Sequence, residues 1–159
     1  MPEMLPKPWL VQKYGGTSIG KLLPTISESI IPLYLQSHRV AVVCSARSGT
    51  TKSKGTTSLL LDAIQLATSS DPRMVVLNLI IDTIKEDHLV AVDITLGGNA
   101  EDVLRTVQLQ IMKDCEKLRS LLQATVMLAE ISDRTTDRVL AIGETLSCRI
   151  VAASLEAKV

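Results

Sequence analysis

The sequence predicts a helix-rich α/β fold with few parallel strands. Two short stretches have the character of strands, since positions 9–14 lead into a glycine turn and positions 39–45 contain a continuous apolar run. An apolar run without polar alternation is typical of a parallel strand buried on both faces. After position 56 the chain instead repeats apolar residues at the spacing of amphipathic helices. The 159 residues are enough for one domain with its own core.

Composition and charge exclude several classes of function. The 17 Lys and Arg residues balance 17 Asp and Glu residues, so nothing indicates a nucleic acid or an anionic membrane surface as partner. No signal peptide and no membrane-spanning apolar run is recognisable, and we expect a cytoplasmic protein. Cys44, Cys115 and Cys148 are odd in number and lack metal-site spacing, which predicts buried free thiols and no metal site.

The chain is predicted to begin with a flexible lead over residues 1–8, followed by a single domain over residues 9–159. Pro2, Pro6 and Pro8 lie in the lead. Proline lacks a backbone donor and restricts the residue before it, so this segment is expected to be extended.

The first strand runs into a turn that can hold an anion. Gly15 and Gly16 allow the backbone to turn tightly, and Thr17 or Ser18 can cap the helix that follows. Free N–H groups at a helix N-terminus, two hydroxyls and the ammonium of Lys13 together predict a cradle for phosphate or carboxylate. An ordinary strand-to-helix turn is the alternative.

The helix after this turn is predicted to run from about position 18 to position 36. Pro24 and Pro32 lie inside it, and an interior proline removes a backbone donor, so we expect an early break or two helical pieces. The second strand follows at positions 39–45. Two parallel strands joined by a helix form a right-handed βαβ unit.

Positions 46–55 form a polar loop at the C-terminal end of the second strand, rich in Ser, Thr, Lys and Gly. Ligands of open α/β sheets bind at this edge of the sheet. The composition predicts mobility, and both a solvated loop and a substrate lid remain open.

The rest of the chain is predicted to be helical. One helix begins near position 56, and Asp71 is a plausible N-cap for the next, with Pro72 at its first position. Positions 85–91 are ambiguous. Asn99 is expected to cap a long helix, and a last helix is expected from about Thr136 to the end.

Four segments carry a resemblance to a known family. The sequence KYGGTS at positions 13–18 resembles the K-F-G-G-T-S signature of aspartate kinases, with Tyr in place of the usual Phe. Three further segments agree in order and spacing: VVCSA at 42–46, GTTSLL at 55–60 and IGETLSC at 142–148. The residues in these segments are similar to those of fungal members of the family. The resemblance covers nearly the whole chain, but the chain covers a minor part of the family's length.

The resemblance implies roles for individual residues. It implies that Lys13 contacts the ATP phosphates and the phosphoryl group in transfer, where a fixed cation offsets developing charge. It assigns Thr57 and Glu144 to the amino acid side, with Glu144 accepting hydrogen bonds from a substrate ammonium. Lys13 and Glu144 are therefore the candidate catalytic residues. The candidate phosphate- and substrate-binding residues are Gly15, Gly16, Thr17, Ser18, Ser45, Thr57 and Glu144.

Other residues are weaker candidates. Gly143 costs about 1 kcal/mol in a helix interior, which indicates close approach by another backbone or a ligand, or a helix break. Arg149 is expected to form an ion pair or lie on the surface. His38 and His88 match no metal or triad pattern, and the sequence offers no base to activate Cys44 as a nucleophile.

The family implies an amino acid kinase fold of three α/β/α layers, of which this chain would hold an incomplete, helix-rich part resembling the N-terminal lobe. The implied activity is ATP-dependent phosphorylation of the L-aspartate side-chain carboxylate, with ATP and Mg²⁺ required. In this family the ATP site lies largely in the C-terminal half of the domain, before regulatory ACT domains. We therefore expect the isolated chain not to be a competent kinase and to need no cofactor.

Two alternatives to a kinase remain open from the sequence. One is a repurposed enzyme that needs no ATP, of the cyclase, isomerase or lyase type, acting on an apolar metabolite in the former amino acid pocket. The other is an interaction module that pairs with itself or with a full-length kinase. Two strands alone leave an open edge and an uncovered face, so we expect a homo-oligomer that binds a small molecule.

Overall fold

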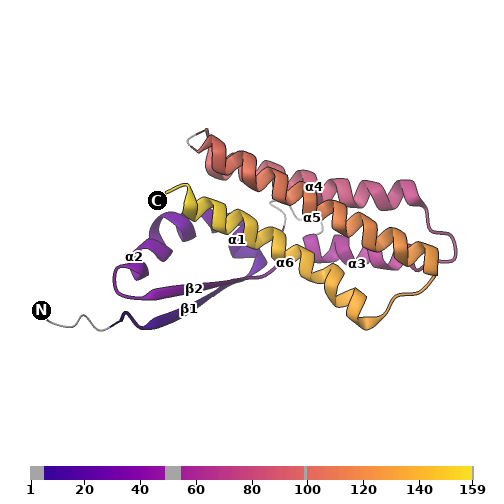
Figure 1. Cartoon of the computed structure of the whole chain (residues 1–159), viewed down its shortest axis with the longest axis horizontal. Helices are drawn as coiled ribbons and strands as arrows, with labels where there is room; N and C mark the ends of the chain where they lie inside the picture. The colour runs from indigo at the N-terminus through magenta and orange to yellow at the C-terminus, as the bar shows by residue number, and fades with distance from the viewer. Residues whose placement is uncertain (1–5, 49–54, 99, 159) are drawn as a thin grey trace, which may run out of the picture.

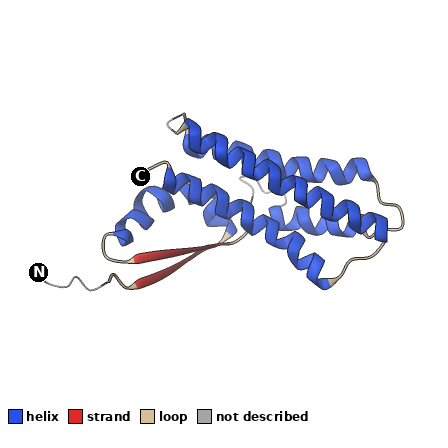
Figure 2. Ribbon diagram, in the orientation of Figure 1, coloured by secondary structure: helices blue, strands red, loops and turns tan. Residues whose placement is uncertain are grey.

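The computed structural model describes residues 6–48, 55–98 and 100–158. The elements follow in the order β1 (Trp9–Tyr14), α1 (Gly16–Thr25), η1 (Ile26–Ile30), α2 (Ile31–Leu35), β2 (Arg39–Cys44), α3 (Thr56–Ala67), α4 (Met74–Leu96), α5 (Glu101–Leu128) and α6 (Asp133–Glu156). The two strands lie on one side of α6 near α1 and α2, whereas α4 and α5 run side by side along another side of α6, and α3 packs next to them (Figure 1). The helix-rich α/β fold is confirmed, as Figure 2 shows.

The two strands form a parallel pair, as predicted. Their register aligns Trp9 with Arg39 and Tyr14 with Cys44, so both strands end at the same edge. The expectation that the second strand is buried on both faces was wrong, because the Val43 side chain is 49% exposed. Within the described residues the sheet has two strands, and one of its faces lies open.

The first helical region begins two residues earlier than predicted. Gly15 is the N-cap of α1 with extended backbone angles, and no side chain of the described residues caps it, so the expected caps Thr17 and Ser18 were wrong. The expected interruption is present as η1, a π-helical segment between the two prolines. The Ser27 hydroxyl in η1 donates a hydrogen bond to the Leu23 carbonyl oxygen at 3.0 Å. A side chain therefore provides a hydrogen bond to the backbone where the regular α-helical pattern is interrupted.

The later helices differ from the prediction mainly at their starts. α4 is preceded by Arg73 as N-cap, so the assignment of Asp71 and Pro72 to a helix start was wrong, and positions 85–91 lie inside α4. Asn99 lies outside the described residues, and α5 begins at Glu101. α6 begins at Asp133 rather than Thr136, because the Ser132 hydroxyl accepts the Thr135 N–H at 3.2 Å and caps the helix there.

The core lies between α3, α4, α5 and α6 and is built from aliphatic side chains. Its fully buried members include Leu60, Leu77, Ile81, Ile111, Leu118, Leu122, Leu146 and Ile150. Burial of aliphatic side chains stabilises each helix against its neighbours. The core fixes α6 from one side and leaves another side of this helix to face β2. No helix in the described part of the chain is long and apolar enough to cross a membrane.

Candidate functional site

The segment that leaves β2, residues 45–48, is enclosed by three helices. The Ser48 N–H donates to the Gly16 carbonyl of α1 at 3.1 Å, and the Thr56 N–H of α3 donates to the Arg47 carbonyl at 3.1 Å. A Cβ added to Gly16 would collide with the Ala46 carbonyl oxygen. Only glycine therefore allows α1 to approach so closely.

The third helix is α6, which meets the same segment through Gly143. A Cβ at this position would lie 2.9 Å from the Ala46 Cβ and 3.2 Å from the Thr56 Cγ2. Gly143 lies in the helix interior, so of the readings left open by the sequence, close approach by another part of the chain is confirmed and a helix break is not. The residue after it, Glu144, is consequently held next to the exit of β2.

Arg47 corrects the expectation of a solvated polar loop for the start of this segment. Its side chain is only 6% exposed and forms an ion pair with Asp87 of α4. A buried guanidinium requires such a partner, because an unpaired buried charge is strongly unfavourable. The described start of the loop is thus packed against the helices, and positions 49–54 lie outside the described residues.

Three of the predicted binding residues meet in one cavity of about 320 Å³. Ser45, Thr57 and Glu144 line it, each from a different segment: the exit of β2, the first turn of α3 and the middle of α6. Leu140 and Ala141 supply apolar walls. The structure therefore brings together the residues that the resemblance assigned to the amino acid side.

Asp137 also lines this cavity, although it was not among the predicted site residues. It lies seven residues before Glu144 on α6, two helical turns away on the same face. Because residues seven apart on a helix share a face, this spacing could have indicated Asp137 once Glu144 was identified as a candidate. Two carboxylates, two hydroxyls and no cationic side chain among the described lining residues make this cavity suited to a ligand ammonium.

The predicted anion cradle lies at the start of α1, beside the segment that leaves β2. The Lys13 Nζ is 3.9 Å from the position that a Gly15 Cβ would take, so the ammonium reaches the glycine turn. The Ser48 hydroxyl donates to the Thr17 hydroxyl oxygen at 3.4 Å. Gly15, Gly16, Thr17 and Ser18 form the start of α1, where backbone N–H groups and the helix dipole favour an anion. None of these residues lines the cavity of Ser45, Thr57 and Glu144.

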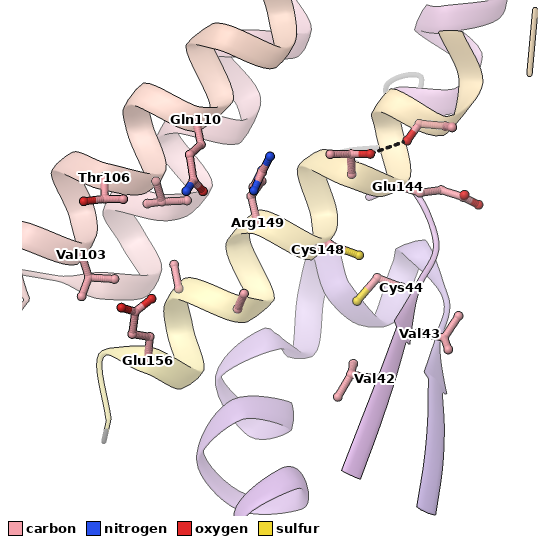
Figure 3. A pocket seen from close by; sticks show the side chains of 15 residues that line it. Val42, Val43, Cys44, Val103, Thr106, Gln110, Glu144, Cys148, Arg149 and Glu156 are labelled. Carbon is pink, nitrogen blue, oxygen red and sulfur yellow. Dashed lines mark hydrogen bonds between the residues drawn. The ribbon is translucent and has the colours of Figure 1, made fainter. Parts of the chain in front are cut away.

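A larger cavity of about 690 Å³ adjoins the first, with Glu144 and Ala141 lining both. Figure 3 shows it between the end of β2 and helices α5 and α6. The Arg149 Nε donates to the buried Asp114 carboxylate at 3.2 Å, so the expected ion pair is confirmed. Cys44 and Cys148 lie on the wall, and Cys148 is exposed, which corrects the expectation that all three thiols are buried.

The histidines lie away from both cavities. His88 is fully buried in α4, with its Nδ1 2.7 Å from the Ile84 carbonyl oxygen. Burial lowers its pKa below the ordinary value. The His38 Nδ1 lies 2.8 Å from the Ser37 hydroxyl. No group of three or more His, Cys, Asp or Glu side chains in the described ranges is arranged to hold a metal ion.

Comparison with known proteins identifies relatives along nearly the whole chain. No family model matches it. An aspartokinase of Candida albicans is 40% identical over 148 residues, which cover 93% of this chain and 26% of that protein. Aspartokinases of Schizosaccharomyces pombe and Saccharomyces cerevisiae are 39% and 37% identical, and the matches cover 94% and 91% of this chain but 28% and 27% of those proteins. The chain thus spans about a quarter of the length of these relatives.

Proposed function

Because the chain belongs to the aspartate kinase family over nearly its whole length, we propose that it supplies the amino acid side of a site at which ATP phosphorylates the side-chain carboxylate of L-aspartate. The observation that carries this proposal is the convergence of Ser45, Thr57 and Glu144 on one cavity. Relatives named as kinases favour this function over an ATP-independent enzyme or an interaction module.

The chemistry of the cavity fits an amino acid. The carboxylates of Glu144 and Asp137 would accept hydrogen bonds from the substrate ammonium, and charge-assisted bonds of this kind are the stronger ones. The Ser45 and Thr57 hydroxyls would donate to a substrate carboxylate. Thr57 lies in the first turn of α3, so the positive end of that helix dipole supports the same carboxylate.

The glycine turn after β1 would supply the phosphate side. Lys13 provides a cation beside the N-terminus of α1, the arrangement that stabilises negative charge in phosphoryl transfer. ATP with Mg²⁺ is the phosphoryl donor of this chemistry. Since the chain spans about a quarter of its relatives, binding rather than turnover is the activity proposed for the isolated chain.

Calorimetric titration with L-aspartate tests the amino acid side. Glu144→Gln removes the charge and keeps the shape, and the loss of a charge-assisted hydrogen bond of about 1.5–3 kcal/mol should weaken binding roughly ten- to a hundredfold. Glu156→Gln is the matched control, because Glu156 lies on the same helix and lines the larger cavity only. Equal affinity of wild type and Glu144→Gln, or no binding by the folded wild type, would reject the proposal.

Titration with Mg-ATP tests the phosphate side independently. Lys13→Ala should abolish binding of the polyphosphate, whereas Lys21→Ala, an exposed lysine further along α1, should keep the wild-type affinity. If both variants bind Mg-ATP as the wild type does, the cradle is misplaced. The two titrations use different ligands, so a negative result with L-aspartate does not affect the interpretation of the Mg-ATP titration, and the reverse also holds.

A further inference from the structure

Two cysteines from distant parts of the chain meet on the wall of the larger cavity. Cys44 is the last residue of β2, and Cys148 lies in the middle of α6. Both side chains line the same cavity, and Figure 3 shows the two sulfur atoms close together. Cys44 is 7% exposed, whereas Cys148 is exposed to solvent. A buried thiol therefore lies close to one that solvent reaches.

We propose that Cys44 and Cys148 form a reversible disulfide by exchange with a small disulfide of the oxidised glutathione type. The two side chains lie close together on one cavity wall, and a disulfide requires two cysteines whose side chains approach each other in this way. The pairing joins β2 to α6, two elements that the fold already packs together. Cys115 is fully buried in α5 and belongs to the helical core, so it is not a competitor.

The environments of the two thiols set the order of the steps. Burial and the neighbouring Cys148 raise the pKa of the Cys44 thiol to about 12, so this group is protonated at neutral pH and is a poor first nucleophile. The Cys148 thiolate therefore attacks one sulfur of oxidised glutathione. The glutathione S–S bond breaks, one glutathione thiolate leaves, and a mixed disulfide forms on Cys148.

The second step closes the protein disulfide. Cys44 gives up its proton to solvent, and its thiolate attacks the Cys148 sulfur of the mixed disulfide, which releases the second glutathione thiolate. The two leaving thiolates take up the two protons lost by the protein thiols. Two protein thiols are thus oxidised to one disulfide, and one oxidised glutathione is reduced to two thiols, so atoms and electrons balance.

The position of the pair links it to the neighbouring cavity. Cys44 directly precedes Ser45, and Cys148 lies one helical turn after Glu144. A covalent link at this point would fasten the exit of β2 to α6, which are two walls of the proposed amino acid site. The disulfide itself does not rest on the proposed function, and its test needs neither aspartate nor ATP.

Peptide mapping of the folded chain after incubation with oxidised glutathione tests the proposal. Tryptic cleavage isolates the three cysteines in peptides 40–47, 114–117 and 139–149. Without reduction, we expect a cross-linked species of peptides 40–47 and 139–149, two hydrogens lighter than their sum, while peptide 114–117 keeps a free thiol. Excess reduced glutathione should restore both free peptides.

Two variants separate the steps. Cys44→Ser should stop after the first step and accumulate a glutathione adduct on peptide 139–149, and Cys148→Ser should leave Cys44 reduced. Accumulation of the same stable adduct in the wild type would overturn the proposal, because it would show that Cys44 does not resolve it. Persistence of both wild-type thiols where Cys44→Ser is fully modified would overturn it equally.

Discussion

The Cβ that an alanine would place at Gly143 would lie 2.9 Å from the Cβ of Ala46, closer than real Cβ atoms pack. This contact joins α6 to the segment that leaves β2, and it places Glu144 beside Ser45 at the cavity. A glycine in a helix interior costs roughly 1 kcal/mol relative to alanine, so its presence is explained by the close packing that it permits.

Gly143→Ala should therefore destabilise the protein despite better helix propensity. The added methyl group also meets the Leu60 Cδ1 at 3.1 Å, and overpacking of this kind costs about 1–3 kcal/mol. Urea unfolding measures the change in the free energy of unfolding. Adding Ala46→Gly removes the facing Cβ and should recover part of the loss in a double-mutant cycle. A single variant as stable as the wild type would contradict the packing.

Substitutions at the neighbouring residues Gly16 and Gly15 test whether α1 packs closely against the segment that leaves β2, with Gly15 as the control position. Gly16→Ala drives a methyl group into the Ala46 backbone carbonyl, which cannot move aside like a side chain, and a loss above about 2 kcal/mol is expected. Among the described residues, a Cβ at Gly15 meets the end of the flexible Lys13 side chain at 3.9 Å, and Gly15→Ser introduces a favoured N-cap. We expect Gly15→Ser to be neutral or stabilising in the same unfolding experiment. Similar losses in both variants would show that α1 does not approach the β2 exit as described.

Short sequence patterns predicted those parts of the fold that depend on neighbouring residues, such as strands and turns. The apolar run before Ser45 and the paired glycines after Tyr14 were enough to predict the two parallel strands and the turn between β1 and α1. A helix start was missed where the helix does not follow the capping preference of the local sequence, as at Arg73. The ion pair of Arg47 was missed because its polar neighbours in sequence indicate solvent, whereas its partner Asp87 lies on another helix.

The candidate site was predicted less from the residues than from the family resemblance. Ser45, Thr57 and Glu144 are separated widely in sequence, and no local rule brings hydroxyls and a carboxylate together. Asp137 lacked a motif of its own, so it emerged only when the same face of α6 was known. The proximity of Cys44 and Cys148 likewise depends on how α6 packs against β2, which their spacing in the sequence cannot indicate.

Breaking the ion pair between Arg47 and Asp87 should destabilise the protein. Asp87→Asn leaves a buried guanidinium without a counter-charge, which costs about 3–5 kcal/mol in a fully buried pair. Because the Asp87 side chain is 34% exposed, solvent screens part of this, and a smaller loss is expected. Glu86→Gln, one residue earlier and exposed, should change the urea midpoint little. Equal effects of the two substitutions would contradict a special role for Asp87.

The open face of the sheet supports the prediction that the chain associates with itself. Trp9 and Val11 of β1 are 63% and 66% exposed. Large apolar side chains exposed next to each other on one strand are typical of a surface that contacts another protein chain. Sedimentation velocity over a range of concentrations should show dimers or larger species, and Val11→Lys should shift them toward monomer. Val75→Lys, at a 74% exposed valine on α4, is the control and should leave the distribution unchanged. A monomeric wild type throughout would show the prediction to be wrong.

His88 should make the protein less stable in mild acid. Its pKa is lowered in the folded state, first by burial and then by Arg47, against the opposing effects of the Ile84 carbonyl and Asp87. The unfolded chain therefore binds a proton that the folded chain resists. The contribution of neutral His88 is fully present above about pH 6.5 and is lost as the pH falls below it, with a slope of at most about 1.4 kcal/mol per pH unit.

His88→Leu removes this titration while keeping the site apolar, and the Nε2 of His88 has no hydrogen-bond partner among the described residues to lose. The free energy of unfolding, measured from pH 7.5 down to about pH 5, should fall less steeply for His88→Leu than for the wild type. His38→Gln alters the other histidine and should keep the wild-type dependence, since His88 remains. If the free energy of unfolding has the same pH dependence in the wild type and in His88→Leu, then His88 takes up its proton without unfolding the protein. Its burial would then not determine the loss of stability at low pH.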